Sequence, residues 1–140
     1  MNENETAQLL TLHGIKPTAN RIVVAKALAA EGRPLSLGEL ERRIATIDKS
    51  GIFRSLTLFR EHHLVHVIED GGEGVRYELC RSHSATGDDD MHVHFFCERC
   101  HQTFCLGHIQ IPSVSLPNGY EMTTANYVVK GICPKCAKKP

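Results

Sequence analysis

The stretch Leu64-Val65-His66-Val67-Ile68-Glu69-Asp70-Gly71-Gly72-Glu73-Gly74-Val75-Arg76-Tyr77-Glu78-Leu79 decides the fold of the first half of the chain. Two short runs rich in apolar and β-branched residues, 64–68 and 75–79, flank a segment of glycine and acidic residues. This pattern predicts two antiparallel strands that a turn joins into a β-hairpin.

Helical patterns precede this hairpin. Residues 5–13, 17–30 and 49–62 carry apolar positions at helical spacing between glycine and proline breaks. Ser36 stands three residues before Glu39, a capping-box spacing that starts a further helix. Helices followed by a hairpin are the element order of a winged helix-turn-helix, which we expect in residues 1–80.

The second half contains two CxxC pairs, Cys97-Glu98-Arg99-Cys100 and Cys133-Pro134-Lys135-Cys136. Four thiolates in two such pairs can close a tetrahedral zinc site, so we predict a structural Zn²⁺ on Cys97, Cys100, Cys133 and Cys136. The 32 residues between the pairs exceed the spacing of a compact zinc ribbon. The metal is therefore expected to join the beginning and the end of a small domain.

Strands are expected at 92–97, 103–106 and 120–132, whereas prolines argue against a long helix in 109–119. The polar segment 81–91 lacks an apolar period and is interpreted as a hinge. The fold class is thus α+β, with a winged helix-turn-helix followed by a small α/β domain in residues 92–140.

Composition limits the functional classes. The 140 residues contain 16 basic and 16 acidic side chains, so binding to nucleic acid would need a local patch. No apolar leader or membrane-length run is present, and we expect a cytoplasmic protein that does not bind membranes. Seven of the nine histidines lie between residues 62 and 101, which indicates a further metal site.

Four motifs, in order, resemble the ferric uptake regulator (Fur) superfamily of metal-dependent repressors. Residues 14–21 (GIKPTANR) are similar to its GxxxTxxR opening, and residues 51–56 (GIFRSL) to its TVYRTL recognition-helix signature. Residues 92–100 (HVHFFCERC) resemble its HxHxxCxxC segment, and residues 131–136 (GICPKC) its closing GxCxxC. The order and spacing match over about residues 8–137.

The resemblance implies a homodimer that binds double-stranded DNA at palindromic operators near metal-uptake genes, with residues 92–140 as the dimerisation domain. It also implies a second, regulatory divalent metal at the hinge. His66 and Cys80 fall where zinc uptake regulators place a His and a Cys ligand, which favours zinc as the sensed metal. The candidate ligands of this regulatory metal are His66, Cys80, His92, His94, Cys105 and Glu78. Either His92 or His94 could bind, and Glu78 could instead be a solvated residue of the hairpin.

Arg54 is the leading candidate for DNA contact, because arginine on a helix in the major groove reads guanine with two hydrogen bonds. Gly51 and Phe53 stand in place of the usual Thr and Tyr of the signature, and the loss of two hydroxyls predicts altered affinity or operator preference. The full set of predicted DNA contacts is Lys16, Arg21, Ser50, Gly51, Phe53, Arg54 and Ser55.

Three other functions compete with this one. The same fold could sense iron, manganese or peroxide, but Pro34 stands where iron and peroxide sensors usually carry a His, and Cys105 where they carry an acidic residue. A thiol-redox protein would place CxxC beside a βαβ pattern, which the sequence lacks. A hydrolytic zinc enzyme needs an open coordination position, and four cysteines leave none. We therefore expect no enzymatic activity and no small-molecule substrate.

Overall fold

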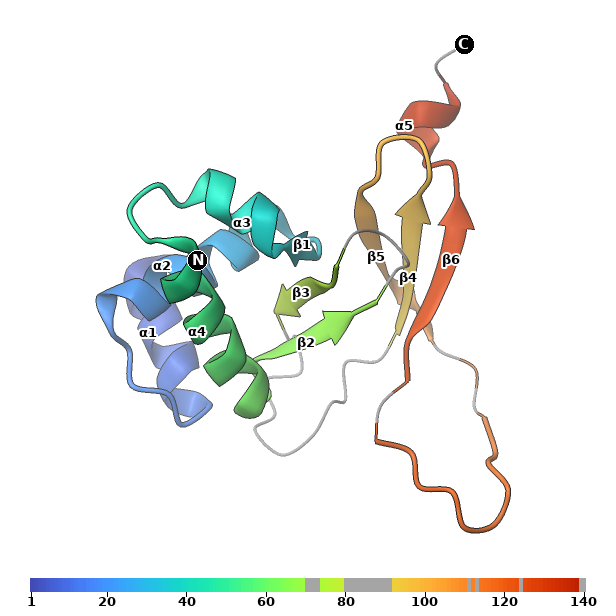
Figure 1. Cartoon of the computed structure of the whole chain (residues 1–140), viewed down its shortest axis with the longest axis horizontal. Helices are drawn as coiled ribbons and strands as arrows, with labels where there is room; N and C mark the ends of the chain where they lie inside the picture. Colours follow the sequence, from blue (N-terminus) through green and yellow to red (C-terminus); the bar gives the residue numbers. More distant parts are fainter. Residues whose placement is uncertain (70–73, 80–91, 111, 113, 124, 139–140) are drawn as a thin grey trace. The chain divides into compact units, whose positions relative to one another are not determined.

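The chain is seen in a computed structural model, which describes residues 1–69, 74–79, 92–110, 112, 114–123 and 125–138. It divides into two compact units, Met1–Asp90 and Met91–Pro140 (Figure 1). The predicted hinge, 81–91, and the candidate ligand Cys80 lie outside the described residues. Among the helices that are described, none has the length and apolar character needed to cross a bilayer.

Helices make up most of the first unit, and each begins at a polar capping residue. The side chains of Asn2, Thr18, Ser36 and Asp48 accept a hydrogen bond from the backbone N–H three residues on. The elements are α1 (Glu3–Leu12), α2 (Ala19–Glu31), β1 (Leu35–Ser36), α3 (Leu37–Arg43) and α4 (Lys49–Glu61). The sequence analysis predicted that α1 begins at residue 5, but it begins at Glu3, because Asn2 is the N-cap and forms a capping box with Glu5.

The predicted hairpin is present. Strands β2 (Val65–Ile68) and β3 (Arg76–Leu79) pair antiparallel. The short strand β1, which the sequence did not predict, pairs with the other edge of β3 and completes a sheet of order β1-β3-β2 (Figure 1). The register places His66 opposite Glu78.

One apolar core holds the first unit together. Ile52, Leu56 and Phe59 follow helical spacing along α4 and are completely buried. They pack with Leu10 and Leu40 of the preceding helices in the same cluster. Full burial stabilises each such side chain by about 1.5–3 kcal/mol relative to exposure. The opposite side of α4 is left facing solvent.

The second unit is a small mixed sheet of order β5-β4-β6. Its elements are β4 (His92–Cys97), β5 (Thr103–Gln110), β6 (Tyr127–Gly131) and α5 (Pro134–Ala137). Strand β4 pairs antiparallel with β5 and parallel with β6. The last strand was predicted to start at residue 120 but starts at Tyr127, and α5 was not predicted. As expected, the described part of 109–119 contains no helix.

The core of this second unit is unusually rich in sulfur. One buried cluster consists of Cys97, Cys133 and Cys136, with Phe95 and Phe104 packed against them, and Val93 and Phe96 are the other buried apolar side chains described in this unit. So small an apolar cluster offers little burial energy, and a domain of this size generally needs an additional source of stability. The mixed α+β fold is the one that the sequence predicts.

Candidate metal centres and nucleic-acid interface

The four cysteines of the two CxxC pairs converge at one end of the second unit, and we call them the four-cysteine cluster. Their Sγ atoms all lie within 4.8 Å of one another. Sγ of Cys100 and Sγ of Cys133 are 3.9 Å apart. In a tetrahedral site with Zn–S bonds of about 2.3 Å, sulfur atoms lie about 3.8 Å apart. The cluster therefore has the composition and the spacing of a closed zinc site.

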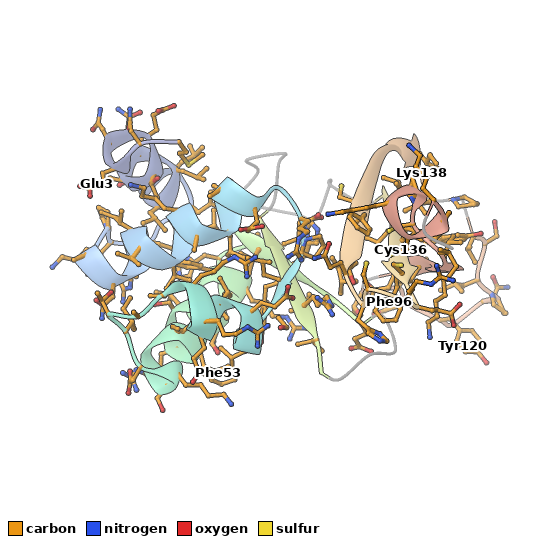
Figure 2. The ribbon with its side chains drawn as sticks, turned by 90° about the horizontal axis from the view of Figure 1, so that it is seen from above. Glu3, Phe53, Phe96, Tyr120, Cys136 and Lys138 are labelled. Carbon is orange, nitrogen blue, oxygen red and sulfur yellow. The ribbon has the colours of Figure 1, made fainter. Side chains whose placement is uncertain are left out.

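The backbone positions the two pairs. Strand β4 ends at Cys97, and α5 begins directly after Cys133, so the turn between β4 and β5 lies beside α5 (Figure 1). The N–H of Glu98 donates a 2.7 Å hydrogen bond to the carbonyl of Gly131, which joins the first pair to β6. Cys136 lies on α5 (Figure 2).

Arg99 supports this arrangement, a role that the sequence analysis did not assign to it. Its Nη1 donates a 2.8 Å hydrogen bond to the carbonyl of Cys136. This contact ties the first CxxC pair to the C-terminal turn of α5, where a cation also compensates the helix dipole. The sequence signal for this supporting role was the position of Arg99 between the two cysteines of the first CxxC pair.

Burial and hydrogen bonding give the thiols of the four-cysteine cluster different pKa values. Burial raises the pKa of Cys97, but N–H donors from Cys100 and Cys133 to its Sγ outweigh that effect and lower the pKa to about 6. Burial and the neighbouring sulfurs raise the pKa of Cys136 to about 12. The fold thus favours the thiolate form of Cys97 and the thiol form of Cys136, and a bound cation would favour the loss of protons from all four.

A second pair of metal-binding groups lies in the first unit. Nε2 of His66 on β2 is 2.8 Å from Oε1 of Glu78 on β3. The side chain of Glu78 is only 4% exposed. Glu78 is therefore a buried partner of His66, and the interpretation of it as a solvated residue was wrong. The half-buried imidazole and the buried carboxylate face each other, and both groups can serve as metal ligands.

A third pair lies in the second unit. His94 on β4 is directly opposite Cys105 on the antiparallel strand β5. Side chains of such cross-strand partners leave the sheet on the same face, about 5 Å apart at Cβ. His92 is paired with Gln110 instead, beyond a register irregularity. The register thus places His94 rather than His92 next to the candidate thiolate.

The predicted DNA contacts divide into exposed and buried residues. Phe53 is 50% exposed, and Arg54 and Ser50 are also exposed on α4; Phe53 points away from the other helices (Figure 2). Gly51 and Ser55 are instead buried, on the side of α4 that packs on the core, so of the α4 candidates Ser50, Phe53 and Arg54 are the ones whose side chains face solvent.

The remaining two predicted contacts, Lys16 and Arg21, lie before and within α2. Lys16 is exposed, and Arg21 is half-buried. Nη1 of Arg21 donates a 3.0 Å hydrogen bond to the carbonyl of Lys16. This bond holds the two cationic residues near each other, which is the local concentration of positive charge that a phosphate contact needs.

Comparison with known proteins now decides the family. Residues 13–130 match the model of the ferric uptake regulator family, which is well over half of the chain. The chain belongs to the ferric uptake regulator family. It is accordingly a regulator of transcription that responds to metal, and its family consists of DNA-binding regulators rather than enzymes.

Solved structures with this fold include several regulators of the family. The Helicobacter pylori ferric uptake regulator, described with three functional metal-binding sites, aligns with a TM-score of 0.62 at 16% identity over 99% of this chain and 96% of its own. A zinc uptake regulator complexed with zinc and DNA gives 0.65 at 16% identity, over 96% and 92%. A zinc-bound manganese uptake regulator gives 0.63 at 19% identity, over 91% and 98%. Among curated protein sequences, no match is found.

At these identities the likeness establishes the fold, and it does not choose between metals. The four-cysteine cluster of this Fur-family chain falls in the second unit, and its last two cysteines lie just beyond the matched residues 13–130. Family membership therefore supports metal binding and DNA binding in general. The choice of metal has to come from the ligand chemistry of this chain.

Proposed function

We propose that this Fur-family chain is a zinc-responsive repressor of metal-uptake genes. The observation that carries the proposal is the cross-strand pair His94 and Cys105, because a thiolate beside an imidazole suits zinc better than iron(II) or manganese. A separate Zn²⁺ on Cys97, Cys100, Cys133 and Cys136 holds the second unit folded, since binding energy at such a site is also folding energy.

The regulatory Zn²⁺ would draw its ligands from both units. His66 and Cys80 would bind it from the first, and His94 with Cys105 from the second, with His92 as the alternative imidazole and Glu78 as a further candidate ligand. Residues 81–91 would act as the hinge. A metal ion that needs ligands from both sides of a hinge binds only one arrangement well and so increases the population of that arrangement.

A homodimer would present two recognition helices to a palindromic operator in double-stranded DNA. The second unit exposes many large apolar side chains, an amount typical of an interface. They are Ile109, Val114, Leu116, Tyr120, Met122, Tyr127, Val129 and Ile132. We place the dimer contact there. In each subunit α4 would enter the major groove with Arg54 and Phe53, while Lys16, Arg21 and Ser50 contact phosphates.

Such a regulator would act in the cytoplasm on DNA, without a small-molecule substrate and without contact with a membrane. Four cysteine ligands leave no open coordination position for catalysis at their site in the second unit. The metal-responsive step would consist of ligand exchange and movement of the units alone.

One observation favours a second candidate. Glu78 is a buried carboxylate bonded to His66, and mixed oxygen and imidazole ligands suit iron(II) or manganese. The same fold would then repress in response to one of those metals, with Cys105 outside the coordination shell. The two candidates differ in whether Cys105 is required.

The test measures operator binding while free Zn²⁺, Fe²⁺ or Mn²⁺ is buffered upward. Zinc alone should increase affinity in the parent protein, and Cys105→Ser and Cys80→Ser should each abolish this increase while one tightly bound zinc per chain remains. Glu121→Gln, an exposed substitution in the second unit, serves as the control. A Cys105→Ser variant that responds as the parent does would overturn the assignment, and a response only to iron or manganese would favour the second candidate.

A further inference from the structure

Strand β3 carries two charged residues, Arg76 and Glu78, that lie two positions apart. Side chains at this spacing leave a strand on the same face. Glu78 bonds to His66 on β2. Arg76 reaches in the other direction, where its Nη1 donates to Oε1 of Glu39 on α3. One strand thus connects the candidate metal ligands of the hairpin to a helix.

The carboxylate of Glu39 is held from several sides. Oε1 accepts from Arg76 and, at 3.1 Å, from the backbone N–H of Ser36, and Oε2 lies 3.1 Å from Nη2 of Arg33. The N–H of Glu39 in turn donates to Oγ of Ser36. The side chains of Glu39, Arg33 and Arg76 are each only 13% exposed. An exposed pair can rearrange freely, but a largely buried carboxylate with both oxygens engaged is held in one geometry.

The backbone makes the same connection. Ser36, the N-cap of α3, is directly opposite Arg76 in the β1–β3 pairing. The first turn of α3 is therefore fixed to β3 by both backbone and side chains. Beyond that turn, Leu40 is completely buried in the cluster that contains Ile52 and Leu56 of α4. A displacement of β3 would reach the recognition helix through this packing.

We propose that the Arg76–Glu39 pair couples the regulatory metal to the DNA-binding helices. Metal bound by His66 and Glu78 would replace the hydrogen bond between them and fix the position of β3. Through its ion pair with Glu39, Arg76 would transmit a displacement of β3 to α3, and the packing of α3 on α4 would transmit it to α4. The inference rests on the proposed function, because it needs a metal at His66 and Glu78. Arg76 and Glu39 would be positioning residues that touch neither the metal nor DNA.

The experiment compares Arg76→Met, Glu39→Gln and the double variant with the parent. Operator affinity is measured with and without saturating Zn²⁺, and the ratio of the two is the coupling. Each single variant should lower this ratio by about tenfold, with operator affinity in the absence of metal and the tightly bound zinc unchanged. The double variant should lose no more than either single variant, because both act through one contact.

Arg43→Met is the matched control. Arg43 is also an arginine in an ion pair, since its Nε lies 2.8 Å from Oε1 of Glu31, and it lies on α3. That ion pair joins α3 to α2 rather than to β3, so its loss should leave the ratio at the parent value. Arg76→Lys provides a milder change if Arg76→Met does not fold, and it should give an intermediate ratio.

The outcomes separate the two hypotheses. If the parent itself shows no increase with metal, the proposed function fails, and this inference fails with it. If the parent responds and the Arg76 and Glu39 variants keep its ratio, the proposed function stands and the coupling role is wrong. A purely structural role would lower stability and both affinities in proportion, which leaves the ratio unchanged and also overturns the inference.

Discussion

The N–H of Gly51 donates a 2.9 Å hydrogen bond to Oδ1 of Asp48, the N-cap of α4. A Cβ added to Gly51 would lie 2.7 Å from that same oxygen and 2.9 Å from Cγ2 of Ile47. Both separations are shorter than real Cβ contacts, and the Asp48 oxygen cannot retreat without losing its hydrogen bond. Gly51, which stands in place of the Thr of the family signature, is therefore a residue that this cap accommodates because it has no Cβ.

This contact predicts that Gly51→Ala is destabilising. Glycine to alanine in a helix interior usually stabilises by about 1 kcal/mol. Here overpacking and disturbance of the cap should reverse the sign and cost about 1–3 kcal/mol. Urea unfolding of the zinc-loaded protein measures the difference.

Gly38→Ala is the control for this prediction. A Cβ at Gly38, also in the first turn of a helix, would meet its nearest atoms at 3.9 Å, which is ordinary contact. We expect it to stabilise the protein by up to about 1 kcal/mol. If Gly51→Ala gives the same gain as Gly38→Ala, the cap relaxes more easily than the structure indicates.

Removal of the metal from the four-cysteine cluster should unfold the second unit selectively. Cys97, Cys133 and Cys136 form the buried cluster of this unit, whereas the first unit has a larger apolar core of its own. Structural zinc sites contribute on the order of 10–16 kcal/mol at neutral pH, far more than this small core can replace. Cys136→Ser should therefore lose zinc and the dimer but retain most of the helical circular dichroism.

The matched control for the zinc prediction is Cys105→Ser, which lies outside the four-cysteine cluster. It should keep one zinc per chain and the dimer. A Cys136→Ser variant that stays dimeric and resists proteolysis in residues 92–138 would show that the sheet folds without this metal.

The contacts of the Glu39 carboxylate predict that the protein loses part of its unfolding free energy in acid. Burial alone would raise the pKa of this carboxyl, but the backbone N–H of Ser36 and the guanidinium groups of Arg33 and Arg76 lower it below the usual 4.5. The pKa is lower in the folded state, so the stabilisation is present above pH 4.5 and is lost as pH falls through the folded value. In Glu39→Gln this contribution is absent at every pH.

The difference in unfolding free energy between the parent and Glu39→Gln should therefore shrink as pH is lowered from 6 to about 3. Metal loss in acid affects both proteins and cancels in this difference. Glu41→Gln, an exposed substitution on the same helix, is the control and should change the unfolding free energy by no more than about 0.5 kcal/mol. A constant difference for Glu39→Gln would mean that its carboxyl is not held in the charged form.

The elements that the sequence predicted well are those with local causes. The caps at Ser36 and Asp48 start α3 and α4 where their spacing indicates, and β2 and β3 pair antiparallel as the two short apolar runs predict. The four-cysteine cluster could be predicted because each CxxC spacing already holds two thiols close together, so the fold has only to bring the two pairs into contact.

Elements with distant causes were missed or misplaced. Strand β1 has two residues and exists only because β3 lies beside it. The burial of Glu78 depends on its register with His66, twelve residues away, and the choice of His94 over His92 depends on the register with β5. Such pairings are set by tertiary structure, which short sequence patterns do not encode.

Phe53 predicts a preference for thymine in the operator. Half of this large apolar side chain is exposed on the outer face of α4, and it has no hydroxyl to bond a phosphate or a base edge. In the major groove, the apolar group that it can cover is the thymine methyl. Replacing the contacted thymine by uracil should weaken binding by about 1 kcal/mol, the burial energy of one methyl group.

The Phe53→Ala variant should bind the operator more weakly than the parent and should no longer distinguish thymine from uracil. Leu12→Ala, which removes an apolar side chain 59% exposed on α1, should bind as the parent does. Equal discrimination by the parent and Phe53→Ala would assign the methyl contact to another residue.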